Sequence, residues 1–326
     1  METKTATAPA FSQSYLSWDV LMMGGISIIV CLASWAFMDK SASLYTISNL
    51  AFALAFAVNH PHFLSSYILM YKDFRKNIFQ KPRYFFSAIV VPVALAGVLI
   101  AAMAQHNIGL MGHIVTAMYF LVGWHYVKQV FGCVVVSSAQ RKVYYKSWER
   151  KILLTNLISV WFMSSLGSHA SSGTYDFYGI KHYSLQLPPW LLTATYWVVG
   201  FTFLVTAAMQ LQKYIREGVK PSPPGVAAFV ALYAWYLPTT SHPGFGYLIP
   251  FFHSLQYLSF VYLLKKNQVT AEISPLKDEA HRKAWVTKFG GFALWALVLG
   301  ALAFEYIPKG LDNQQIIPAG VMGTAP

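Results

Sequence analysis

Long stretches without Asp, Glu, Lys or Arg are the feature that most constrains the fold of this chain. Nine of them are candidate membrane spans, because a crossing helix needs about 20 apolar residues. The charged residues inside them are Lys128 and, near the end of the last span, Glu305. Charged residues make up 11% of the chain, compared with about 25% in soluble domains. The sequence therefore predicts an all-α polytopic membrane helical bundle with about eight or nine transmembrane helices. The candidate spans are 20–38, 44–71, 84–104, 108–136, 152–167, 190–212, 225–237, 247–264 and 289–307.

Basic residues are concentrated in the loops that follow the even-numbered spans. The loops 72–83, 140–151, 213–220 and 265–288 carry five, five, three and six Lys/Arg, which is 19 of the 24 in the chain. Short basic loops stay in the cytoplasm, so we expect a cytoplasmic N-terminus and an outer C-terminus. The net charge of +12 is interpreted as a marker of this orientation, and nucleic acid is not expected as a partner.

The same pattern predicts a single transmembrane domain, 20–307, between a cytoplasmic N-terminal segment, 1–19, and a disordered C-terminal tail, 308–326. Such a chain is an integral, multi-pass membrane protein, and we expect it in a bacterial inner membrane. The loop 169–189 is rich in Ser, Gly and Tyr, and we expect it to cap the outer face.

Four of the ten histidines lie within predicted spans: His60, His62, His125 and His253. Three of them lie ten (His62), twelve (His253) and sixteen (His125) residues before the first basic residue of the next loop. At a rise of 1.5 Å per residue, these separations are about 15, 18 and 24 Å. Ionisable side chains at such depth are costly and usually face a bundle interior or a functional cavity. We therefore expect a shared site near the middle of the membrane.

His60 and His62 flank Pro61, which affects whether both can reach that site. In a regular helix, residues i and i+2 point about 200° apart and could not bind one ion. Proline removes a backbone hydrogen bond and kinks a helix, so a kink or a π-bulge would turn both rings inward. The alternative is that Pro61 only bends the helix and that one ring bonds a neighbouring residue.

The chemistry that suits four imidazoles is metal binding, because imidazole coordinates iron, copper and zinc. Of the twelve Asp and Glu, only Asp19 and Glu305 approach the hydrocarbon region, and both lie at span ends. A carboxylate-bridged di-iron site or a 2-His-1-carboxylate triad therefore lacks its acids. The sequence predicts that the four intramembrane histidines are metal ligands, with non-haem iron as the preferred metal and copper or zinc as alternatives.

Two other classes of protein also use buried histidines. A haem held between His125 and His253 stays open as an alternative and would make the protein an electron carrier. In a proton-coupled transporter, the histidines would line an aqueous path and relay protons. The inverted repeats that transporters often contain are not evident in the sequence.

Polar residues on the same helix faces complete the predicted site, since positions three and four apart share a face. Lys128 and Tyr257 are the candidate catalytic residues, with the alternative that Lys128 reaches toward the cytoplasmic surface. The other neighbours are expected to orient the rings. The neighbours are Lys128 and Gln129 after His125, Gln256 and Tyr257 after His253, and Asn59 beside His60.

The remaining histidines lie nearer the ends of the spans. His106, His182 and His281 fall in loops and need no functional explanation. His113, His169 and His242 fall near the outer ends of spans four, five and seven. Whether these three form a second, outer site is left open by the sequence.

The plan of the chain resembles the histidine-rich integral-membrane non-haem iron oxygenases that act on lipids and carotenoids. The nearest likeness is to the membrane β-carotene cleavage dioxygenase family, in small all-helical size and in the intramembrane His60, His62, His125 and His253. It is a likeness of type, and the HxxxH and HxxHH boxes of fatty-acid hydroxylases and desaturases do not occur. The resemblance implies a metal-dependent oxidoreductase or oxygenase whose hydrophobic small-molecule substrate enters from the membrane lipid, with an electron donor as a further partner.

Overall fold

The computed structural model describes residues 17–37, 46–47, 49–51, 53–72, 78–170, 174–177, 180–183, 185–240, 243–276 and 278–313. The predicted N-terminal segment, up to residue 16, and the predicted tail beyond residue 313 lie outside these residues. The last helix continues to Asn313, past the predicted end of the transmembrane domain at 307.

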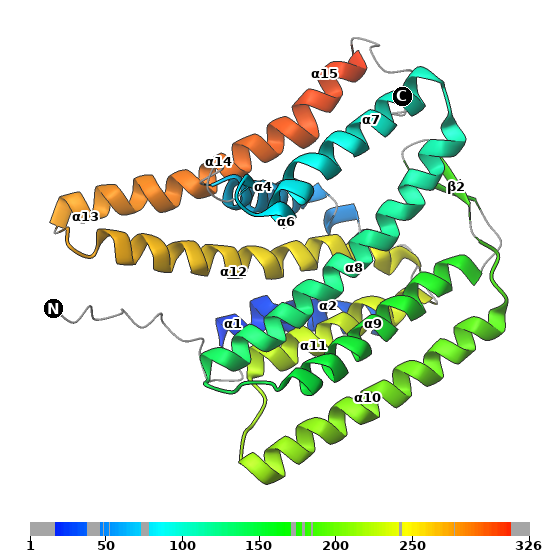
Figure 1. Ribbon diagram of the computed structural model, residues 1–326, viewed down its shortest axis with the longest axis horizontal. Coiled ribbons are helices and arrows are strands. Elements are labelled where there is room, and N and C mark those ends of the chain that lie inside the picture. Colours follow the sequence, from blue (N-terminus) through cyan, green and yellow to red (C-terminus); the bar gives the residue numbers. More distant parts are fainter. Residues whose placement is uncertain are drawn as a thin grey trace.

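A helix or an unbroken series of helices lies at each of the nine predicted spans (Figure 1). The helical class predicted from the sequence is therefore confirmed for the described residues. The elements are α1 (Trp18–Val20), η1 (Leu21–Gly25), α2 (Ile26–Ala36), α4 (Ala55–Tyr71), α6 (Pro82–Phe85), η2 (Phe86–Val90), α7 (Val91–Ala104), α8 (Ile108–Gln140), α9 (Ser147–Ala170), α10 (Pro189–Glu217), α11 (Pro223–Tyr236), η3 (Pro238–Thr240), η4 (Pro243–Tyr247), α12 (Leu248–Ile273), α13 (Asp278–Trp285), η5 (Val286–Gly290), α14 (Gly291–Ala301), η6 (Leu302–Tyr306) and α15 (Ile307–Asn313).

Six of these helical segments are long and apolar enough to cross a membrane, which indicates a membrane protein. The helices α4 and α11 are shorter, at 17 and 14 residues, and α9 carries charged residues in its first turns. Whether these three also cross, and on which side the N-terminus lies, stay predictions. The six segments are Trp18–Ala36, Pro82–Ala104, Ile108–Gln140, Pro189–Glu217, Phe245–Ile273 and Asp278–Gly310.

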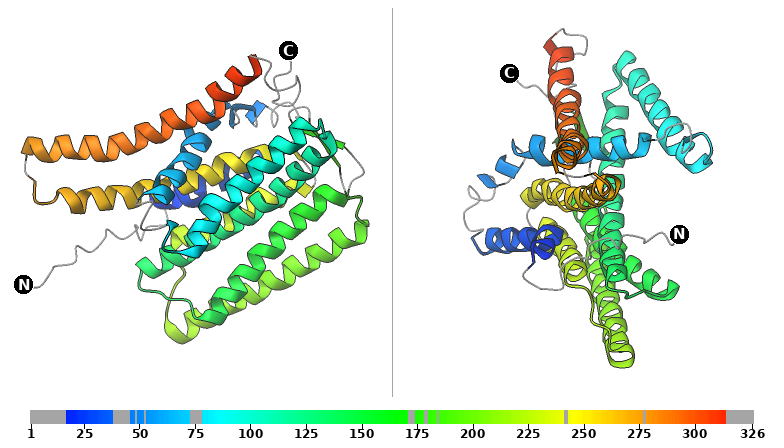
Figure 2. Two further views of the ribbon diagram at one scale, coloured as in Figure 1. Left: turned by 45° about the horizontal axis from the view of Figure 1, so that its top comes forward. Right: turned by 90° about the vertical axis from the view of Figure 1, so that its left-hand side faces the viewer.

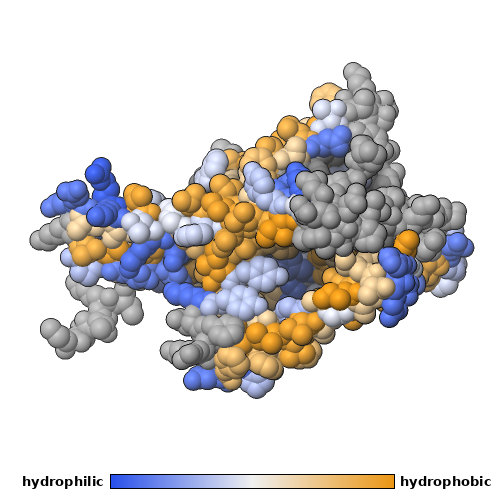
Figure 3. All heavy atoms as spheres, turned by 90° about the horizontal axis from the view of Figure 1, so that it is seen from above, coloured by the Kyte–Doolittle hydropathy of each residue, from blue (hydrophilic) through white to orange (hydrophobic). Residues whose placement is uncertain are grey.

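The outer surface of the bundle is strongly apolar. On α10, for example, Trp197, Phe201 and Ile215 are 78%, 68% and 71% exposed. Figure 3 shows hydrophobic residues over much of the middle of one face and hydrophilic residues toward both of its ends. Soluble monomers rarely expose apolar patches of this extent, so the surface fits a lipid environment. Helices suit that environment because each satisfies its own backbone hydrogen bonds.

Local signals explain where several helices begin and end. The Asn107 side chain accepts a hydrogen bond of 2.9 Å from the Leu110 backbone N–H at the start of α8. Ser222 caps α11 in the same way, as small polar side chains commonly do. The helix α10 ends at Glu217, and the next residue, Gly218, has a φ of 65°, the left-handed conformation that favours glycine.

The helices pack in an order that differs from their order in the sequence (Figure 2). Each element in the following series contacts the next one: α14, α4, α12, η1 with α2, α11, α8, α9 and α10. Gly300 lets α14 approach α4 closely, because a Cβ at this position would lie 2.9 Å from the Cβ of His60. The main apolar core lies between α8, α9, α11 and α12, and includes Val127, Leu157 and Trp235.

A short β-hairpin interrupts the helical pattern between α9 and α10. The strands β1 (Thr174–Phe177) and β2 (Ile180–Tyr183) pair antiparallel, with Thr174 opposite Tyr183. The hairpin lies in the loop that was predicted as a cap, and β2 contacts α8. Figure 1 shows β2 at the opposite end of the bundle from the connections α8–α9, α10–α11 and α12–α13. Three basic loops thus share one end, which is called the basic end below.

Candidate metal centre

His62, His125 and His253 meet where α4, α8 and α12 lie together. Each offers a ring nitrogen, and these nitrogens all lie within 4.8 Å of one another. The ring centroids of His253 lie 5.0 Å from those of His62 and 4.9 Å from those of His125. Three of the four predicted ligands therefore form a group, called the histidine triad here, that could hold one metal ion.

The burial of the triad fits a bound cation. His62 and His253 are 3% and 1% exposed, whereas His125 is exposed on one side. Both ring nitrogens of His62 and of His253 are buried, and none has a hydrogen-bond partner among the described residues. Buried polar atoms are nearly always paired, because an unpaired one costs about 1–3 kcal/mol. A metal ion would satisfy one nitrogen on each ring.

Two glutamines connect the helices that carry the triad. The Gln129 side-chain amide on α8 donates to the His253 carbonyl and to Gln256 Oε1, both at 2.9 Å. Gln256 in turn donates to the carbonyl of Met23 in η1. The sequence predicted that these glutamines orient the rings. In the structure, their hydrogen bonds connect α8 to α12 and α12 to η1, and do not reach the imidazole rings. They therefore set the positions of His125 and His253 indirectly, through the helices that carry them.

We expect Gln129→Leu to lower the metal affinity about tenfold while leaving the fold intact. The substitution removes the two bonds that tie α8 to α12, and changes around metal ligands typically cost 10- to 100-fold in affinity. Competition against a chelator measures the effect on purified protein. Ser259→Ala on α12 is a suitable control, because the Ser259 hydroxyl donates its hydrogen bond to the Leu255 carbonyl on the same helix. An unchanged affinity in Gln129→Leu would show that this tie does not position the ligands.

Asn59 and Tyr257 also lie beside the triad. Asn59 Oδ1 accepts a 2.6 Å hydrogen bond from Ser254, which ties α4 to α12 next to His253. The Tyr257 ring stands perpendicular to the His62 ring at 4.4 Å, and its hydroxyl lies 2.7 Å from Ser66 Oγ. Tyr257 is thus the predicted catalytic residue that the fold places in contact with the triad.

Tyr126 is a neighbour of the triad that sequence reasoning missed. Its ring lies 4.2 Å from that of His253, and it is 9% exposed. It directly follows His125, and consecutive residues on a helix point about 100° apart. The spacing therefore predicts that the His125 and Tyr126 side chains point in different directions. No pattern in the sequence indicates that α12 lies where both can contact His253.

His60 does not join the triad. Its ring stacks on Phe304 of η6, with centroids 5.1 Å apart and an interplanar angle of 22°. The helix α4 runs through Pro61 without a break, so the large angle between His60 and His62 persists. The kink that was expected to bring both rings to one ion does not do so: the His62 ring faces the triad, and the His60 ring packs against η6.

Lys128 lies on the exposed side of α8. Its Nζ is 5.6 Å from the ring centroids of both Trp124 and Phe131, a distance at which a cation is attracted to an aromatic face. The two rings lie one turn before and one turn after Lys128, so the ammonium stays beside its own turn of α8. A catalytic role for Lys128 stays a prediction.

The three outer histidines are not brought into one cluster by the described residues. His113 is exposed on α8. His169, near the end of α9, accepts a 3.4 Å hydrogen bond at Nδ1 from the Leu185 backbone N–H. His242 lies outside the described residues. Within the described part of the chain, the triad is the one group of three or more potential ligands.

The chain shows no significant match to a family model, to a curated protein or to a solved structure. Its function must therefore be argued from the triad and its surroundings.

Proposed function

We propose that the protein is an integral-membrane, metal-dependent oxygenase in which His62, His125 and His253 hold one non-haem iron ion. The observation that carries this proposal is the convergence of three imidazoles from three helices, two of them buried with unpaired ring nitrogens. Three protein ligands leave coordination positions open, as in catalytic rather than structural metal sites. No carboxylate belongs to the group, so the ligand set suits a metal that prefers nitrogen.

The spacing of the triad counts against haem. In bis-histidine haem, the macrocycle fills the plane between two axial imidazoles. Here the third imidazole offers a nitrogen within 4.8 Å of both others, in the space that the macrocycle would need. A proton-conducting path is also disfavoured, because rings that are 1% and 3% exposed have little access to a column of water.

The exposed side of the triad, at His125, is consistent with a substrate that arrives through the membrane. The exposed stripe of α8 consists of Met118, Leu121, His125 and Lys128, at the spacing of one helix face. Leu121 is 62% exposed, so the triad reaches the lateral surface beside apolar side chains. A hydrophobic small molecule dissolved in the lipid could approach His125 along this stripe without crossing water.

In this proposal iron supplies the activation of O₂, and the protein supplies the surroundings. Tyr257, held by Ser66, keeps a hydroxyl proton beside His62. Tyr126 packs on His253 and excludes water from the buried side. The basic end carries most of the positive charge and is the surface that we expect an electron donor to approach.

The experiment that tests the proposal is elemental analysis with an absorption spectrum on detergent-purified protein, followed by oxygen uptake with β-carotene or an unsaturated fatty-acid ester as the probe. We expect about one iron per chain, no Soret band, and uptake that depends on the probe and on iron. A Soret band would show that the histidines bind haem instead. Stoichiometric zinc, or a folded protein that binds no metal, would overturn the oxygenase.

A further inference from the structure

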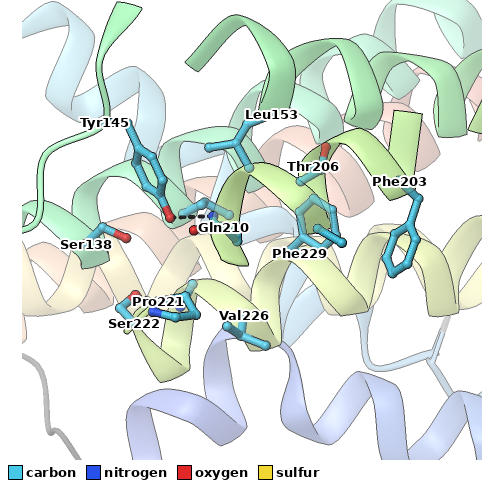
Figure 4. A pocket seen from close by; sticks show the side chains of 13 residues that line it. Ser138, Tyr145, Leu153, Phe203, Thr206, Gln210, Pro221, Ser222, Val226 and Phe229 are labelled. Carbon is cyan, nitrogen blue, oxygen red and sulfur yellow. Dashed lines mark hydrogen bonds between the residues drawn. The ribbon is translucent and has the colours of Figure 1, made fainter. Parts of the chain in front are cut away.

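A cavity of about 110 Å³ lies among α8, α9, α10 and α11, away from the triad (Figure 4). Val134 lines it from α8, nine residues after His125. Nine residues correspond to two and a half helical turns, so the cavity and the triad use opposite faces of α8. For comparison, an apolar cavity of about 150 Å³ can hold benzene. The volume therefore suits the end group of a larger molecule rather than a whole lipid.

One end of the cavity offers hydrogen-bond donors. The Tyr145 hydroxyl accepts a 2.8 Å bond from Gln210 Nε2 and keeps its own proton to donate. Ser138 is 1% exposed, and its Oγ has no hydrogen-bond partner among the described residues. Figure 4 shows the Ser138, Tyr145 and Gln210 side chains on the same side of the cavity. Two hydroxyls that can each donate a hydrogen bond therefore line this end of the cavity.

Away from this end most of the lining is apolar and leads to the outer surface, and the hydroxyls of the lining residues Thr206 and Ser222 are bonded within the protein. Leu153, Phe203, Val226 and Phe229 form this part, and Figure 4 shows them away from Ser138. Phe203 and Val226 are 44% and 39% exposed, so the cavity opens laterally toward lipid. The polar part lies near the basic end, since Ser138 is in the last turn of α8. A molecule bound there would have its oxygen at that end and its chain in the membrane.

The charges near the cavity indicate that the bound group is neutral. No charged side chain is among the described residues that line it. Lys213 lies 5.7 Å from the Tyr145 ring, but its Nζ is already paired with Glu149 at 3.2 Å and Glu217 at 3.0 Å. Arg141 also lies beside the cavity, where its guanidinium donates a 3.4 Å hydrogen bond to the carbonyl of the lining residue Pro221. A carboxylate or phosphate head at the Tyr145 end would meet Glu149 and Glu217 beside Lys213.

We infer that this cavity binds an uncharged lipid with a hydroxyl or carbonyl oxygen at the end of an apolar chain, held by hydrogen bonds from Ser138 and Tyr145. The site is separate from the triad and does not depend on its metal. Isoprenoid alcohols, long-chain alcohols and the ring carbonyls of lipid quinones share this chemistry.

The test uses the full-length protein in detergent and a dodecanol that carries a photoreactive diazirine on its chain, with the labelled residues mapped by mass spectrometry. The corresponding carboxylate and a diazirine-bearing quinone are run beside it. We expect labelling of α10 and α11 residues around the cavity by the alcohol and the quinone, with the carboxylate about tenfold weaker. Preferential labelling by the carboxylate would overturn the inference.

Two neighbouring positions on α10 provide matched variants. Ala207 lines the cavity, whereas Ala208 lies on another face of the same helix. Ala207→Phe is expected to remove cavity labelling, and Ala208→Phe to preserve it, with equal metal content in both. Ser138→Ala and Tyr145→Phe should each weaken labelling about fivefold by removing a donor. Equal labelling in the two phenylalanine variants would show that the probe only coats the lipid-facing surface and would contradict the site.

Discussion

His62→Ala and His253→Ala are each expected to lower iron affinity by at least about 100-fold, whereas His60→Ala should change it by less than about threefold. Removing one of three ligands leaves the ion with two, and even residues that only support metal ligands contribute 10- to 100-fold. His60 stacks on Phe304 and contributes no nitrogen to the triad. Iron retained per folded chain, measured by elemental analysis after a chelator challenge, separates the two outcomes.

The His60 variant is the matched control, because it removes the same side chain two residues away on the same helix. Each preparation is first checked for a single monodisperse peak and for native helix content, so that lost iron is not lost fold. An equal loss of iron in all three variants would restore His60 to the ligand set and contradict a three-histidine centre. Full retention of iron in His62→Ala and His253→Ala would show that the histidine triad is not the metal site.

Lys213→Ala is expected to lower the free energy of unfolding by about 3–5 kcal/mol, the effect of breaking a buried ion pair by removing one partner. The Lys213 Nζ and Glu149 Oε1 atoms lie 3.2 Å apart, and each side chain is 3% exposed. Without Lys213, the Glu149 carboxylate stays buried between α9 and α10 with its charge uncompensated. Denaturation in a fixed detergent, followed by helix content, measures the loss.

The chain offers an exposed pair for comparison. Lys288 Nζ lies 2.8 Å from Glu272 Oε2, with side chains 48% and 45% exposed. Exposed pairs of this kind are worth about 0–1 kcal/mol, so Lys288→Ala should change stability by no more than that. The double variant Glu149→Gln/Lys213→Ala should recover part of the loss, because it removes the stranded charge. Similar small effects at both lysines would contradict a stabilising role for the buried pair.

Much of the fold could be predicted because hydrophobicity and charge are local properties of the chain. The nine apolar stretches became helical segments, and the basic loops described by the structure gather at one end. Depth along a helix follows from residue count and a rise of 1.5 Å. That is why counting residues from the basic loops was enough to place His62, His125 and His253 in one layer.

The sequence could not determine which way a side chain faces around its helix. In a soluble protein, an apolar stripe marks the buried face of a helix. In a lipid-exposed bundle, both faces of a helix are apolar, so α4 carries no such mark, and His60 and His62 looked equally suitable as ligands. The choice between them was decided by the packing of α4 between α12 and α14, which turns His62 to the triad and His60 to Phe304.

Contacts between distant segments were decided by the tertiary structure for the same reason. Tyr126 reaches His253, and Lys213 reaches Glu149 although both lie at or near predicted loops. The cavity with Ser138 and Tyr145 exists only because α10 and α11 pack beside α8. The sequence by itself determined a membrane bundle with histidines at a common depth. Only the packing of the helices decided which three of them meet, because rotation about a helix axis is set by its neighbours.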